Sequence, residues 1–99
     1  MEINIFKKDV ERCIKKCNKE IENRKNGVKG ESSLAQLEQT ILPELEGILF
    51  QIKTNNLPAP SERYLISFAN AFTVWGWNMQ NPTDLFILLA KLNQNYKTI

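Results

Sequence analysis

The side chains with the most reactive chemistry in this 99-residue sequence are two cysteines, Cys13 and Cys17. They lie four positions apart in a segment with a helical pattern, which holds their Cβ atoms about 5–6 Å apart, whereas a disulfide needs about 3.5–4.5 Å. Structural zinc normally takes four nitrogen or sulfur ligands, so two thiols alone make a poor metal site. We therefore expect two buried free thiols, and we predict neither a metal nor a cofactor.

The sequence contains no histidine, which is the commonest general base and the usual partner of a serine or cysteine nucleophile. Carboxylates remain as candidates for acid–base chemistry, and Glu44 and Glu46 are close in the sequence. Residues two apart point to different sides of a helix, however, so this pair is expected to consist of separate surface charges. We predict that the protein is not an enzyme.

The elements that position these residues follow from apolar side chains that recur every three or four positions, which is typical of amphipathic helices. A first helix is predicted over residues 3–26. Gly27 follows it and suits the left-handed conformation that commonly ends a helix. The apolar stripe of this helix consists of Ile3, Phe6, Val10, Cys13, Cys17 and Ile21.

A second helix is predicted over residues 33–54, because Ser33 and Gln36 have the spacing of a capping box at its start. Pro43 interrupts this helix. A proline inside a helix removes one hydrogen bond and clashes with the preceding turn. We expect either a kink near Thr40 or a break into two shorter helices, and the sequence leaves both open.

Two further helices are predicted over residues 60–75 and 82–96, each with a proline at its first position, where the missing N–H group costs nothing. Gly76 is expected to end the first of them, with Trp77 folded back onto Phe72. The apolar stripe of that helix, expected to lie in the core, consists of Leu65, Phe68, Phe72 and Trp75.

These elements predict an all-α fold, in which residues 1–99 form a single domain. It is a compact bundle of four helices, or of five if Pro43 splits the second. Hydrophobic residues make up 42% and charged residues 24% of the chain, which is ordinary for a globular protein. The sequence has neither the ~20-residue apolar run of a membrane span nor a signal-peptide pattern, so we expect a cytoplasmic location.

Five residues are candidates for contact with a partner. Glu38 falls inside the apolar stripe of helix 33–54, where an unpaired charge is costly to bury. It is therefore either partly exposed, paired with a lysine of helix 3–26, or part of an interface. Phe50 lies nearly opposite that stripe and is either covered by another helix or exposed. The remaining candidates are Glu44, Glu46 and Trp77, the last because exposed tryptophan often dominates binding energy.

The distribution of charge suggests the kind of partner. Residues 1–30 hold nine Lys or Arg against five Asp or Glu, whereas residues 31–62 hold one against five. The acidic segment is suited to a basic partner protein such as a nuclease. We therefore predict a non-catalytic protein-binding module, an inhibitor that neutralises a toxin or effector as a bacterial immunity protein or antitoxin does.

Two alternative functions stay open. Helix 3–26 carries a basic surface that is able to contact nucleic-acid phosphates, although acidic residues lie among the basic ones. A structural homo-oligomer would instead bury Phe50 and the apolar stripe of helix 3–26 between copies of the chain. The basic residues concerned are Lys7, Lys8, Arg12, Lys15, Lys16 and Lys19.

Overall fold

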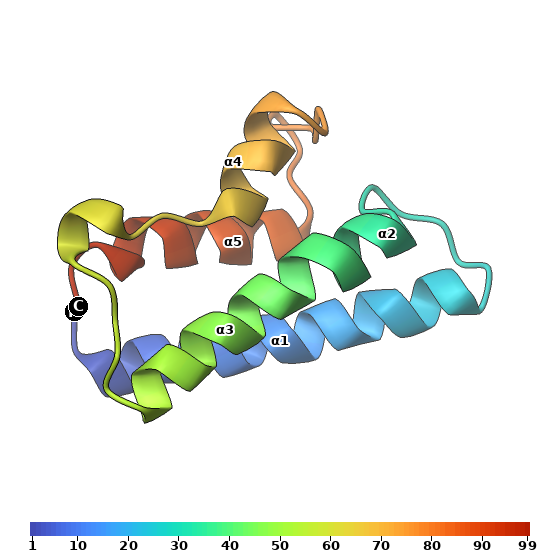
Figure 1. Ribbon diagram of the computed structural model, residues 1–99. Helices are drawn as coiled ribbons and strands as arrows, with labels where there is room; N and C mark the ends of the chain where they lie inside the picture. The colour runs from blue at the N-terminus through green and yellow to red at the C-terminus, as the bar shows by residue number, and fades with distance from the viewer.

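The computed structural model describes all 99 residues and contains helices but no strand. The α1 helix packs against both α3 and α5, and α4 contacts α5 and projects from the bundle (Figure 1). The predicted all-α bundle is thus confirmed. The helices are α1 (Ile3–Lys25), α2 (Leu34–Gln36), a π-helical segment (Leu37–Ile41), α3 (Leu42–Lys53), a 3₁₀ turn (Pro60–Glu62), α4 (Ile66–Thr73) and α5 (Asp84–Tyr96).

The end of α1 and the start of α2 agree with the local signals, whereas α4 ends at Thr73, two residues before the predicted position 75. Gly27 and Gly76 both take a positive φ, of 82° and 66°, a conformation that costs glycine little because it has no Cβ. The capping box at the start of α2 is present. The Ser33 hydroxyl accepts a hydrogen bond from the Gln36 N–H group, and the Gln36 side chain accepts one from the Ser33 N–H group, each at 3.0 Å.

Pro43 does not split the second helix, because a π turn precedes it. The Leu42 N–H group donates to the Leu37 carbonyl, five residues back, where an α-helix would use the fourth. Pro43 then falls in the first turn of α3, where its missing donor is least costly. The helical path therefore runs without a gap from α2 to α3, and the irregularity lies around Thr40, where a kink was one of the two expectations.

The third helix begins at Ile66, whereas the sequence predicted residue 60. Pro60 starts only a single 3₁₀ turn, and Arg63 and Leu65 then take extended backbone with ψ of 108° and 116°. The extended course places both side chains inside the protein, since Leu65 is fully buried and Arg63 nearly so. Tertiary burial therefore overrides the local preference for a helix.

The last helix begins at Asp84, two residues later than predicted. The Thr83 hydroxyl accepts a hydrogen bond from the Phe86 N–H group at 3.2 Å, so Thr83 is the N-cap and Pro82 precedes the helix. Threonine is a good cap, and the backbone at Thr83 is extended, with ψ of 162°, as is typical of an N-cap residue.

Arg63 joins the segment after α3 to the C-terminal end of the chain. Its guanidinium group donates to the carbonyl oxygens of Pro58 at 2.8 Å, Ile99 at 2.7 Å and Tyr96 at 3.4 Å. It also lies 6.0 Å from the centre of the Tyr96 ring, within the range of a cation–π interaction. The charge is therefore buried but well supplied with acceptors, which is the condition for tolerating it.

We predict that Arg63→Ala lowers the free energy of unfolding by about 2–4 kcal/mol, because the change removes these hydrogen bonds and leaves buried carbonyls unpaired. Urea unfolding followed by circular dichroism measures the effect. Lys97→Ala is the control, since Lys97 is exposed, and its effect should stay within about 0.5 kcal/mol. Equal losses for the two variants would contradict the role of Arg63.

Candidate functional site

The two thiols are buried in the core, as the sequence predicted. Both cysteines are free, and neither exposes any surface. Burial raises the pKa of Cys13 to about 12, and the neighbouring Cys17 contributes to the rise. Burial likewise raises the pKa of Cys17 to about 12, with smaller contributions from Glu20 and Glu46. Because the thiolate is the reactive form, neither cysteine is a nucleophile at neutral pH.

The raised thiol pKa values predict a loss of stability in alkali. Unfolded thiols ionise from about pH 9, whereas the folded ones keep their protons up to about pH 12. The unfolded state therefore binds fewer protons in this window, and the free energy of unfolding falls by up to about 1.4 kcal/mol per pH unit for each thiol. Urea unfolding between pH 8 and 11 should give a steeper decline for the natural chain than for the Cys13→Ala/Cys17→Ala variant. Parallel curves would contradict the prediction.

The acidic candidates have different surroundings. Glu38 is partly exposed and its carboxylate lies 3.6 Å from the ammonium group of Lys25, so the expected pairing with a lysine of the first helix is confirmed. Glu44 accepts hydrogen bonds from the backbone N–H groups of Ile66 at 2.6 Å and Ser67 at 2.9 Å. It therefore caps α4, at the helix end where a negative charge is favourable. Glu46 is exposed on α3.

The aromatic candidates differ in exposure. Phe50 is 66% exposed on the outer side of α3, so it is not covered by another helix. Trp77 is buried and belongs to the core. It folds back as one of the two expectations had it, but its ring packs against Trp75 at 5.5 Å and Phe86 at 5.4 Å, with no ring contact to Phe72. Trp77 therefore packs beneath the surface residues and does not offer an exposed ring to a partner.

The aromatic residues of α4 do not fill the core as the sequence predicted. The residues that α4 buries are Ser67 and Ala71, one turn apart, whose small side chains allow its backbone to approach the bundle. Phe68 is only partly buried, and Phe72 is 49% exposed. The eight-residue α4 turns the side with Ser67 and Ala71 inward, so its phenylalanines lie at or near the surface.

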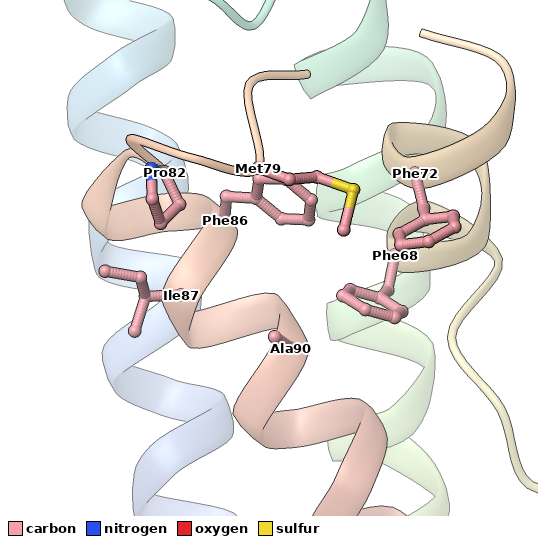
Figure 2. Close-up of a pocket in the computed structure, with 7 residues that line it drawn as sticks. All are labelled: Phe68, Phe72, Met79, Pro82, Phe86, Ile87 and Ala90. Atoms are coloured by element: carbon pink, nitrogen blue, oxygen red, sulfur yellow. The ribbon is translucent and has the colours of Figure 1, made fainter. Parts of the chain in front are cut away.

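These side chains line an apolar groove between α4 and α5, with a volume of about 260 Å³. Figure 2 shows Phe68 and Phe72 projecting from α4, with Phe86 and Ala90 on α5 across the gap and Met79 extending between the two helices. An adjoining hollow of about 320 Å³ is lined by the same two α4 phenylalanines. The groove is lined by Phe68, Phe72, Met79, Pro82, Phe86, Ile87 and Ala90.

The groove rests on a continuous series of packed rings. Phe72 and Phe68 lie 6.3 Å apart, Phe68 and Phe86 lie 5.8 Å apart, and Phe86 then meets the Trp77 ring edge-on at 5.4 Å. Aromatic pairs at such separations add about 0.5–1.5 kcal/mol each beyond the area they bury. The groove is therefore already formed in the isolated chain.

The segment that contains α4 and leads into α5 lacks charge. No Asp, Glu, Lys or Arg occurs in the twenty residues from 64 to 83. The same stretch supplies five of the chain's eleven exposed large apolar side chains. Apolar side chains that cluster on a surface, in contrast to isolated ones, mark interaction sites. This site was not predicted from the sequence, because the helical spacing of Phe68 and Phe72 indicates core positions, although the uncharged stretch is a feature of the sequence itself.

The basic surface of α1 is partly neutralised within the chain. Arg12 pairs with Asp9 at 3.3 Å, and Lys16 pairs with Glu20 at 3.4 Å. Both interactions join residues one turn apart on α1, so they reduce the positive field along the helix. The structure therefore contains no specific feature that favours nucleic-acid binding by α1 over protein binding at the groove.

Comparison with known proteins supplies no relative. The chain matches no protein-family model, no curated protein and no solved structure. None of its helices combines the length and hydrophobicity that crossing a membrane requires. The candidate site is therefore defined by its geometry alone.

Proposed function

We propose that this chain is a non-catalytic protein-binding module that docks a partner protein in the apolar groove between α4 and α5. The single observation that carries the proposal is the exposure of Phe72 and Met79 beside that groove, in a domain whose other helices bury their main apolar stripes. Aromatic side chains and methionine are enriched at protein interfaces. Such contacts gain most when a pocket is already formed.

The proposed docking element is an apolar, uncharged helix of the partner. The groove runs between two helices, and a third helix with apolar residues every three or four positions would fit along it. Because no charged side chain lines the groove, a charged partner residue inside it would lose its hydration without gaining a counter-ion. The lining thus favours an apolar segment over a charged one.

The finer proposal is that docking neutralises the partner, in the manner of a bacterial immunity protein or antitoxin. A small rigid domain can inhibit a toxin by covering its active site or its binding surface, and it needs no reactive group to do so. The proposed place of action is the cytoplasm, where free thiols are kept reduced. Of the carboxylates in the acidic segment, Glu38 pairs with Lys25 and so contributes less to the attraction of a basic toxin. Glu31 and Glu44 keep their charge, because they accept hydrogen bonds only from backbone N–H groups.

The test is co-expression of the chain with candidate toxins encoded by neighbouring genes, with complex formation and toxin activity measured. Phe72→Lys and Met79→Lys should each weaken binding about 30-fold, as expected for a central apolar contact worth about 2 kcal/mol. Ile5→Lys and Val28→Lys are matched controls. Ile5 is 50% exposed on a helix, as Phe72 is at 49%, and Val28 is 53% exposed in a loop, comparable to Met79 at 56%.

Two results would overturn the proposal. One is a toxin complex that both groove variants form as tightly as the controls do. The other is a homodimer in analytical ultracentrifugation that Phe72→Lys converts to a monomer, because a second copy of the chain would then occupy the groove. Heteronuclear NMR spectra of each variant establish that the fold is retained.

A further inference from the structure

A second pocket, distinct from the apolar groove, lies between α3, the segment 58–66 and the end of α5. Its volume is about 360 Å³. Its polar lining consists of groups that bear oxygen, and no lysine or arginine side chain contributes to it. These polar residues are Glu44, Gln51, Glu62, Tyr64 and Tyr96.

The two carboxylates of this pocket are not neutralised by a side chain. Glu44 is fixed in place by the two N–H groups at the start of α4, which leave further lone pairs on its oxygens. Glu62 is exposed and takes part in no ion pair. Its sequence neighbour Arg63 directs its guanidinium group at the carbonyls of Pro58 and Ile99 instead. A pocket with this lining attracts a cation.

The two tyrosines contribute differently to this pocket, Tyr64 with an exposed ring and Tyr96 with its phenol oxygen. The Tyr96 ring is already covered by Phe6, stacked on it at 5.6 Å, and by the Arg63 guanidinium group. The Tyr96 hydroxyl donates a hydrogen bond to the Gln51 side-chain oxygen at 3.1 Å, which fixes the phenol and leaves its oxygen free to accept. Tyr64 is largely exposed at the rim. Aromatic rings combined with carboxylates are the usual means by which proteins hold ammonium and guanidinium groups.

Gly47 leaves space in the pocket wall. It lies inside α3, where glycine is less stable than alanine by about 0.5–1 kcal/mol. A Cβ atom built there would meet no other atom within 4 Å, and its φ is not positive. Neither close packing nor backbone conformation within the chain therefore accounts for a glycine at this position, and its absent side chain keeps the pocket open.

We propose that this pocket binds an organic cation, namely the guanidinium or ammonium group of an arginine- or lysine-like compound. The charged group lies between the carboxylates of Glu44 and Glu62. Its alkyl chain packs over Gly47 and against Ile48 and Ile66, which supply the apolar part of the lining. The site is independent of the apolar groove.

The test is an NMR titration of the folded, ¹⁵N-labelled chain with N-acetyl-arginine methylamide. The expected result is saturable shifts of the Gly47, Gln51 and Ile66 amides, with a dissociation constant on the order of 1 mM. The citrulline derivative has nearly the same shape without the charge and should give no saturable shifts. Equal shifts with the citrulline compound, or none with the arginine compound, would overturn the proposal.

Three variants separate this site from a general attraction of cations. Glu62→Gln should weaken arginine binding about fivefold, as expected for loss of one exposed charge worth about 1 kcal/mol, and Gly47→Leu should abolish it by filling the pocket. Glu22→Gln removes an exposed glutamate of α1 and should leave binding unchanged. An equal effect of Glu22→Gln and Glu62→Gln would contradict a specific site.

Two further probes distinguish the sources of the cation. An alanine-rich peptide with one central arginine represents the side chain of a partner protein, and putrescine represents a free metabolite. Tighter binding of the peptide than of the blocked amino acid would assign the site to a partner's side chain. Tighter binding of putrescine would assign it to a small molecule. If neither displaces the arginine compound, the proposal is wrong.

Discussion

The burial of Arg63 and Leu65 in an extended segment determines what the rest of the chain presents to solvent. Arg63 needs three carbonyl acceptors, and those of Pro58, Tyr96 and Ile99 are close to it only if the chain stays extended there. The extended course delays the start of α4. The resulting eight-residue helix turns Ser67 and Ala71 toward the bundle, and its phenylalanines lie at the surface beside α5.

Glu44 connects this segment to the main bundle. Leu65 precedes α4 and offers no side-chain cap, so the first N–H groups of the helix would be unpaired without the carboxylate that α3 supplies. The same carboxylate forms part of the wall of the second pocket. One side chain therefore both positions α4, with the apolar groove that follows from it, and contributes charge to a separate binding site.

The two surfaces differ in the kind of contact that they favour. The groove is apolar, preformed by packed rings and free of charge, so it gains free energy from removing apolar area from water. The lining of the second pocket is less apolar than that of the groove and carries negative charge. The pocket therefore selects ligands by their charge, and its affinity for them falls as the salt concentration rises. A partner that engaged both would present an apolar helix and a basic side chain on one face, and its affinity would exceed that of either contact alone.

Local physics in the sequence was sufficient for the helical class, for the buried stripe of α1 from Phe6 to Ile21 although not for Ile3, which is exposed, and for the ends marked by Gly27 and Ser33. Each of these depends on residues within a few positions of one another. The start of α4, the capping by Glu44 and the exposure of Phe72 depend on contacts between segments more than twenty residues apart. Only the folded chain brings such groups together, and burying Arg63 with its acceptors outweighs the modest local preference for a helix after Pro60.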